Sequence, residues 1–285
     1  MVKSFTIVND DIYGANRSCV EASPEYMQIV YEIDEQIKFT ADFANLLPDR
    51  VFIRVGACTI NLIGIFQSLG LTLRNLRHCC LHYCIADANT LLRKYRDDLF
   101  FCLYAAVYHE KESSGHDMES GQSMMERNLL DWVNGGLHDL HFGIVLKHIA
   151  GLSSVKEIVD RYGLKARFDA IGDELNDYVH GNGINFYNEC FWKGSDTSEP
   201  VKRVKGISEN LIKITVTFVL LVAICLPHYL MSTDYTDYLE TGQNPPDGSQ
   251  YFVAPFVEQY LKKHLSLIDP GCYRYLQENT TMKFN

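Results

Sequence analysis

Asn176 and His180 have the residue types and the spacing that acid–base chemistry requires. The sequence from Gly163 to Val179 predicts a helix that ends at Gly181, so positions 176 and 180 share one helical face. A histidine in the last turn lies beside free carbonyls and the negative end of the helix dipole, which favours its protonated form. His180 is therefore a candidate general acid or base, with Asn176 as a hydrogen-bonding neighbour.

The segment around these residues, 175–182, reads LNDYVHGN and resembles the motif of the HEPN superfamily. RNases of that superfamily are helical domains that carry an arginine, a polar residue that is often Asn, three further residues and a histidine on a late helix. Asn176 and His180 match this pattern, whereas Leu175 stands where the family has arginine. The resemblance implies an all-α multi-helix bundle that forms a homodimer and binds RNA. The activity that it implies is that of a metal-independent endoribonuclease (a hydrolase) of bacterial antiviral defence or toxin type.

A cation from elsewhere must replace the motif arginine if cleavage occurs, because charge builds on the phosphate when the ribose 2′-hydroxyl attacks. Arg93 and Arg96 are the candidates, since they interrupt the apolar pattern of a helix predicted over 85–107. The 91–101 stretch of that helix is similar to helices of abortive-infection relatives. The long helices of HEPN-like bundles pack side by side, and a dimer partner often completes the cleft. The predicted catalytic set is thus His180, Asn176, Arg93 and Arg96.

A non-catalytic interpretation explains the same residues. A histidine at a helix end can cap carbonyls, and Arg93 and Arg96 can form ion pairs along their helix with Asp97 and Asp98. The alternative function is a catalytically inert HEPN-like interaction module, which binds a partner protein, such as a regulator, or a nucleotide-derived ligand. Leu175 favours this alternative.

Lys202, Arg203 and Lys205 form a compact basic run that follows a polar connection and begins a helix, so they are candidate contacts for RNA phosphates. Asn182, just after the motif, is a fourth candidate RNA-binding residue. Such a run is more often a solvated helix face. The net charge of −10 disfavours a protein that coats nucleic acid through its overall field.

The sequence predicts neither a metal nor a cofactor. His78, Cys80, His82 and Cys84 have ligand types, but ligands strung along one helix cannot all face one ion, and no CxxC pair supplies the rest. The phosphate-binding loop GxxxxGK[ST], the dinucleotide-binding GxGxxG and the nucleophile elbow GxSxG are all absent from the sequence.

Composition indicates a folded cytoplasmic protein. Hydrophobic residues make up 47% and charged residues 22% of the chain, which is ordinary globular usage. Nine irregularly spaced cysteines and a start without a long apolar core favour reduced thiols in the cytosol. The apolar stretch 214–231 approaches the length of a membrane span, but its polar interruptions favour a buried core helix, so we expect no membrane insertion. A membrane-associated sensor is the alternative for this stretch.

The elements that must position these residues follow from apolar periodicity and turn signals. We expect an N-terminal arm over 1–22 with at most a short β element at 5–8, a helical bundle over 23–231, and a C-terminal wrap over 232–285 with one or two helices. Ser23-Pro24 should begin the first helix, another should start near Pro48, and Gly70 should punctuate the next. Mobile loops are expected near 111–123 and 193–200.

Overall fold

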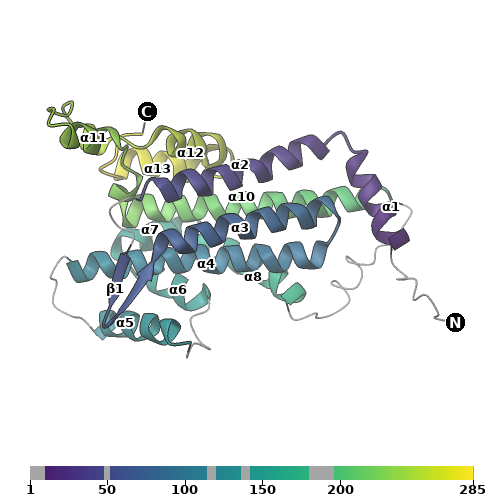
Figure 1. The fold of residues 1–285 in the computed structure, drawn as a ribbon, viewed down its shortest axis with the longest axis horizontal. Coiled ribbons are helices and arrows are strands. Elements are labelled where there is room, and N and C mark those ends of the chain that lie inside the picture. Colours follow the sequence, from purple (N-terminus) through teal and green to yellow (C-terminus); the bar gives the residue numbers. More distant parts are fainter. Residues whose placement is uncertain (1–9, 48–51, 114–119, 136–141, 180–195, 285) are drawn as a thin grey trace. The chain divides into compact units, whose positions relative to one another are not determined.

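The chain is an all-α protein, as the sequence predicts. This computed structural model describes residues 10–47, 52–113, 120–135, 142–179 and 196–284 (Figure 1). The α-helices are α1 (Asp10–Glu21), α2 (Tyr26–Asn45), α3 (Leu62–Leu81), α4 (Ile85–Ser113), α5 (Ser120–Val133), α6 (Phe142–Ala150), α7 (Ser153–Arg161), α8 (Leu164–Val179), α10 (Glu199–Cys225), α11 (Asp234–Glu240), α12 (Pro255–Ile268) and α13 (Pro270–Asn279). Two short 3₁₀ helices, η2 (Pro227–Leu230) and η3 (Ser249–Tyr251), accompany them.

The chain forms two compact units whose residues interleave along the sequence. Unit 1 comprises residues 1–37, 71–95 and 169–212, and unit 2 comprises residues 38–70, 96–168 and 213–285. The boundaries fall inside α2, α3, α4, α8 and α10, so each of these long helices contributes residues to both units. The predicted division into an arm, a bundle and a C-terminal wrap stays a prediction.

Unit 2 has an aromatic core. Phe218 on α10 lies with its ring centroid 5.5 Å from that of Phe43 on α2 and 6.2 Å from that of Phe66 on α3, in edge-to-face and tilted arrangements. Phe100 on α4 lies 5.1 Å from Phe168 on α8 and 6.3 Å from Phe218. All five rings are buried, and such ring pairs add to the stabilisation that burial gives.

The β element is a hairpin that the sequence analysis missed. Strands β1 (Phe52–Val55) and β2 (Cys58–Asn61) pair antiparallel, where a helix starting near Pro48 was predicted. That prediction is wrong for 52–61, because Ile53, Val55 and Ile60 alternate with exposed residues in the two-residue period of a strand. Gly56 turns the hairpin with a φ of +56°, and the hairpin packs beside α5 (Figure 1).

Three further boundaries differ from the predictions. The first helix begins before residue 22: α1 spans Asp10–Glu21 and buries Asn16 and Val20. Gly70 does not interrupt α3, where a glycine costs only about 1 kcal/mol relative to alanine. The predicted loop 111–123 is shorter at both ends, because α4 continues to Ser113 and α5 begins at Ser120. The predicted strand at 5–8 lies outside the described residues.

The C-terminal region contains three α-helices, whereas the sequence predicts one or two. Beside α12 and α13, residues 234–240 form the short helix α11. Asp269 separates α12 from α13: its Oδ1 accepts a hydrogen bond of 3.1 Å from the Cys272 amide, which caps α13. Arg167 on α8 donates to the other carboxylate oxygen at 2.7 Å. This bond joins α8 to the C-terminal helices within unit 2.

The apolar stretch near 214 belongs to α10. In the described part of the chain, α10 is the one helix whose length and composition would allow a membrane span, with a mean hydropathy of 1.9 over its most apolar window. Within the structure 78% of that window is buried, as in the core helix of a globular protein.

Replacing Phe218 by alanine tests the aromatic core. Phe218 is 2% exposed, so Phe218→Ala should lower the free energy of unfolding by about 3–5 kcal/mol through lost burial and a cavity. Leu267→Ala is the matched control, because Leu267 is 82% exposed and should change stability by no more than about 0.5 kcal/mol. Urea denaturation followed by circular dichroism measures both. Equal effects of the two substitutions would contradict this packing.

Candidate functional site

Unit 1 contains an open pocket of about 790 Å³, within the usual range of about 300–1,000 Å³ for small-molecule sites. The end of α1, the turn into α2 and the beginning of α10 form its walls. The lining residues are Ser18, Cys19, Ala22, Ser23, Pro24, Glu25, Thr197, Ser198, Val201, Lys202 and Lys205.

The first wall forms where Ser23 and Pro24 separate two helices. The backbone turns here, with the Tyr26 amide donating to the Ser23 carbonyl at 3.1 Å. The Ser23 hydroxyl accepts a bond of 3.1 Å from the Glu25 amide, which fixes the entry into α2. The predicted helix start at Ser23-Pro24 is wrong by two residues, because α2 begins at Tyr26 and Ser23 lies in the turn before it.

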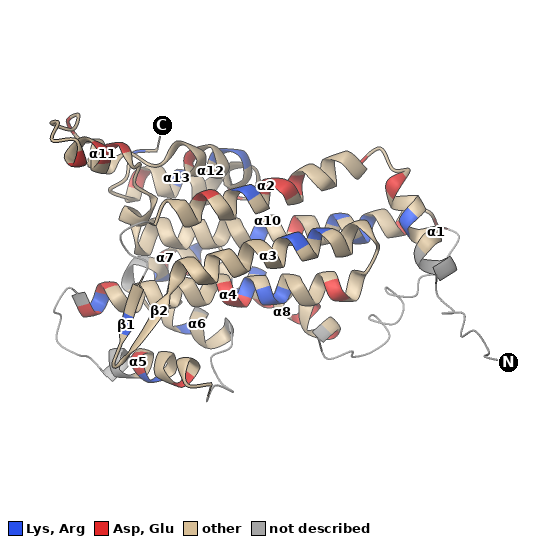
Figure 2. Ribbon diagram, viewed as in Figure 1, with Lys and Arg blue, Asp and Glu red and all other residues tan. Residues whose placement is uncertain are grey.

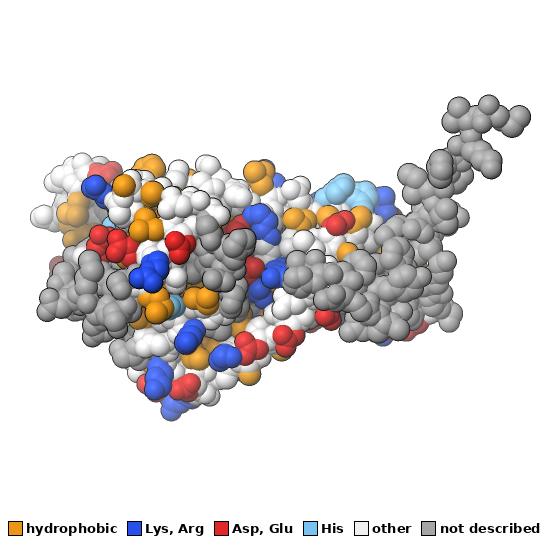
Figure 3. Space-filling view, turned by 90° about the horizontal axis from the view of Figure 1, so that it is seen from below, with side chains coloured by type: hydrophobic (Ala, Val, Ile, Leu, Met, Phe, Trp, Pro, Cys, Tyr) orange, Lys and Arg blue, Asp and Glu red, His pale blue; other side chains and the backbone are white. Residues whose placement is uncertain are grey.

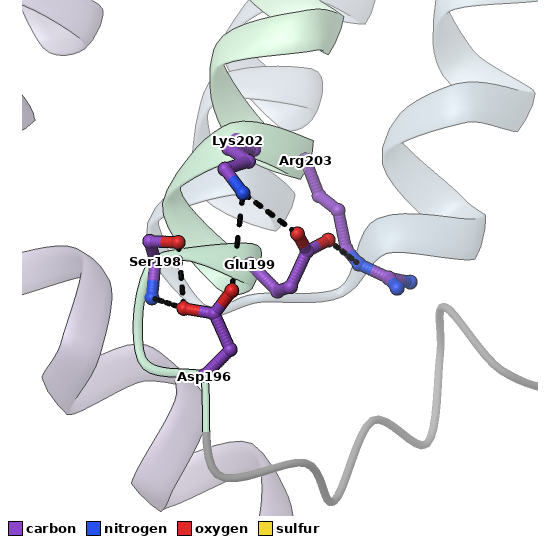
Figure 4. A network of polar contacts seen from close by, with 5 residues as sticks. All are labelled: Asp196, Ser198, Glu199, Lys202 and Arg203. Carbon is purple, nitrogen blue, oxygen red and sulfur yellow. Dashed lines mark hydrogen bonds and ion pairs between the residues drawn. The ribbon is translucent and has the colours of Figure 1, made fainter.

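The second wall forms where Asp196 organises the start of α10. Its Oδ1 accepts one bond of 2.9 Å from the Ser198 amide and one of 2.6 Å from the Ser198 hydroxyl (Figure 4). These bonds stabilise the ionised carboxylate, so they lower the pKa of Asp196, and Lys202 adds to the effect. The turn places Thr197 and Ser198 against the pocket just before Glu199 begins the helix.

The cations predicted to contact RNA lie in this region, and each has a carboxylate partner. The Lys202 ammonium lies 2.9 Å from Glu199 and 3.9 Å from Asp196, as Figure 4 shows, and the bond to Glu199 raises the pKa of Lys202. Glu199 also lies 4.0 Å from Arg203, and Glu25 lies 3.3 Å from Lys205.

These cations differ in their access to the pocket. Lys202 and Lys205 line it and are 61% and 45% exposed. The Arg203 side chain is only 14% exposed and is not part of the lining. The structure therefore brings two of the predicted RNA-binding residues together at one cavity. Asn182 lies outside the described residues.

The catalytic set of His180, Asn176, Arg93 and Arg96 stays a prediction. His180 lies outside the described residues, and Asn176 is half-buried on α8 in unit 1. Arg93 is half-buried on α4 in unit 1, whereas Arg96 belongs to unit 2.

Arg96 and Leu175 both have packing roles. Arg96 is 4% exposed, and its Nε donates to Asp97 at 2.9 Å, as the non-catalytic interpretation of this helix expects. Leu175, at the position of the motif arginine, is completely buried. Its side chain therefore contributes to packing.

Sequence reasoning missed most of the pocket. The sequence predicts a helix start at Ser23-Pro24 and a loop at 193–200, but no sequence pattern indicates that these segments meet. Ser18 and Cys19 are not among the predicted site residues, because the sequence predicts an arm over residues 1–22. The pairing of Lys205 with Glu25 is the contact that joins the two walls.

The described residues contain no group of three or more His, Cys, Asp or Glu side chains that could hold a metal ion. His78 and His82 lie close, with ring centroids 4.2 Å apart. Cys80, between them, is completely buried, whereas His78 is exposed, so the two side chains point in different directions.

Comparison with known proteins gives no family: no model of a protein family, no curated protein and no solved structure matches this chain. The HEPN resemblance stays a prediction.

The Asp196 turn predicts a measurable titration. The pKa of Asp196 should lie below its ordinary value of 3.8, so the turn is fully formed at neutral pH and is lost as the carboxylate is protonated in acid. Ser198→Ala should raise this pKa, because it removes the largest cause of the shift. Lys202→Ala should raise it less. Carboxyl NMR titration measures all three proteins, and a larger effect of Lys202→Ala would contradict the assignment.

Proposed function

We propose that this chain is a HEPN-like helical binding module, and that its unit 1 pocket receives a nucleotide-derived ligand that carries phosphate. The observation that supports this proposal most directly is one cavity of about 790 Å³ lined by two exposed lysines and by several hydroxyl groups. Cavities of this size commonly hold small ligands, with a few polar groups that fix their orientation.

The polar lining suits phosphate. Lys202 and Lys205 present ammonium groups, and a lysine binds phosphate as a point charge with three N–H donors. The Ser23 hydroxyl lines the same cavity and can donate to a phosphate oxygen, since it accepts from the Glu25 amide, whereas the hydroxyls of Ser18 and Ser198 already donate to the Gly14 carbonyl and to Asp196. Glu25 is the one carboxylate in this lining, and Glu199 and Asp196 lie beside Lys202, so a phosphate must compete with carboxylates for both lysines.

The carboxylate partners of the lysines do not prevent binding. Ion pairs between exposed side chains contribute only about 0–1 kcal/mol, so a doubly charged phosphate can compete with Glu25 for Lys205 at small cost. Lys202 keeps donor capacity beyond its bond to Glu199, because an ammonium carries three N–H groups.

The rest of the lining is apolar and suits the uncharged part of such a ligand. Ala22, Pro24 and Val201 contribute aliphatic surface beside the polar groups, and Cys19 adds a polarisable thiol. A ligand with both a phosphate and a ring system can therefore use more of the pocket than phosphate alone.

Two features favour ligand binding over RNA cleavage. Lysines and arginines lie among carboxylates on most of the helices (Figure 2) and on the face seen in Figure 3, whereas RNA backbone binding needs clustered positive charge. Arg96, one candidate for the missing catalytic cation, is buried and bonded to Asp97. RNA binding and cleavage, the homodimer, a regulatory protein partner and the cytoplasmic location stay predictions.

Isothermal titration with ATP and with tripolyphosphate tests the proposal. ATP should bind more tightly than tripolyphosphate, because only ATP carries a ring system for the aliphatic wall. The double variant Lys202→Ala/Lys205→Ala should weaken ATP binding at least about tenfold, since each ammonium forms a charge-assisted hydrogen bond. Lys156→Ala, on an exposed part of α7 in unit 2, is the matched control and should bind like the wild type.

Incubation of the wild type and of His180→Ala with total RNA separates the two functions. The proposal predicts that both leave the RNA intact. Cleavage that His180→Ala abolishes would instead favour the endoribonuclease. Equal ATP binding by the wild type and the double lysine variant would overturn the pocket assignment.

A further inference from the structure

The wall of the pocket that α1 provides is also held by a contact between an arginine and a histidine. Arg17 on α1 lies with its Nη1 3.1 Å from Nδ1 of His82, next to the C-terminal end of α3 in unit 1. A guanidinium has only donors, so Nδ1 must accept this hydrogen bond. The contact therefore requires that Nδ1 of His82 carries no proton, so the His82 ring must be neutral.

Four neighbouring groups act on His82. His78, one turn earlier on α3, has its ring centroid 4.2 Å away. On α1, Arg17 carries a positive charge and Glu21, bonded to the Arg17 Nε at 2.7 Å, a negative one. The Cys84 thiol lies 3.8 Å from the His82 carbonyl oxygen. Protonation of His82 would thus put a second positive charge beside Arg17 and remove the acceptor that Arg17 uses.

The surroundings oppose that protonation. Partial desolvation, then His78 and Arg17, lower the pKa of His82, and Glu21 only partly offsets them. When α1 moves away, His82 returns towards its ordinary pKa of about 6.5, so the released form binds the proton more readily than the closed form. The contact is therefore fully present above about pH 6.5 and is lost as the pH falls below that value.

The same helix carries part of the ligand pocket. Ser18 and Cys19 follow Arg17 directly and line the cavity, while Asn16 and Val20 are buried and hold α1 to the rest of unit 1. Loss of the Arg17 contact removes one attachment of this wall and leaves the burial of Asn16 and Val20. The wall should then loosen, and the backbone hydrogen bonds of α1 should open more often, because an undocked helix of 12 residues is only marginally stable.

We propose that the Arg17–His82 contact is an acid-sensitive latch: protonation of His82 releases the α1 wall and lowers the affinity of the pocket for phosphate ligands. The effect on affinity rests on the proposed function, whereas the release of α1 does not. The latch closes at neutral pH and opens towards pH 5.5.

Hydrogen exchange of the α1 backbone amides, corrected for intrinsic rates, tests the latch without any ligand. Protection of residues 14–21 in the wild type should fall about fivefold between pH 7.5 and pH 5.5, the loss expected for one hydrogen bond. In His82→Asn the amide oxygen replaces Nδ1 as an acceptor that does not titrate, so protection should stay constant. Arg17→Ala should show low protection at both pH values.

His78→Asn is the matched control, because it keeps the Arg17 contact and removes a neighbouring group that lowers the pKa of His82. The pH dependence should persist in this variant, with its midpoint at higher pH. Unchanged α1 protection in the wild type between the two pH values would overturn the latch, as would a pH response in His82→Asn equal to that of the wild type.

ATP titrations at both pH values then test the coupling. The wild type should lose about fivefold in affinity at pH 5.5 relative to His82→Asn, which cancels any titration of ATP itself. Equal affinities of the two proteins at pH 5.5, with α1 released in the wild type, would overturn the coupling. Absence of ATP binding at pH 7.5 would contradict the proposed function, and the exchange measurement would still decide the latch.

Discussion

The pocket depends on the register of α10 in unit 1, which two buried polar side chains fix. Ser208 is completely buried and its hydroxyl donates to Glu32 on α2 at 2.8 Å, while Asn210, 7% exposed, donates to Glu174 on α8 at 3.1 Å. A buried hydroxyl or amide without a partner costs about 1–3 kcal/mol, so a shift of α10 along its axis is disfavoured. This register sets where the first two turns of α10, with Lys202 and Lys205, meet the turn between α1 and α2.

The chemistry of the site follows from its balance of charges. Asp196 and Glu199 hold Lys202 at the start of α10, and Glu25 holds Lys205 from the opposite wall. These exposed pairs keep the lysines near the cavity without binding them strongly, and the bond to Glu199 raises the pKa of Lys202. Such an arrangement suits reversible binding of a small anion. Within the described residues, this arrangement contains no group that is positioned to transfer a proton during RNA cleavage.

Apolar periodicity predicted the long helices well, because their faces repeat over many residues. The first residues of α8 and α10 lie within three residues of the predicted starts at Gly163 and Lys202. The hairpin at 52–61 was missed because its strands are short and its alternation competes with the helical pattern that follows. The helix α1 was missed because its buried face rests on few residues, Asn16 and Val20 among them.

The candidate site could be predicted only in part. Lys202 and Lys205 were recognised from their charge, and Ser23 from its place before proline, since these are local signals. The contact of Lys205 with Glu25 joins residues far apart in the sequence, and no local pattern encodes it. The burial of Leu175 and Arg96 is likewise a property of packing rather than of the motif.

NMR titration of the isotopically labelled protein with ATP tests the central claim, the location of the ligand, most directly. The account predicts that the backbone amides of Ser18, Ser23, Thr197 and Ser198, which border the cavity, shift together as ATP is added. Shifts centred on Asn176 and on the amides of residues 180–182, with none at the pocket, would contradict it and would favour the motif as the binding site.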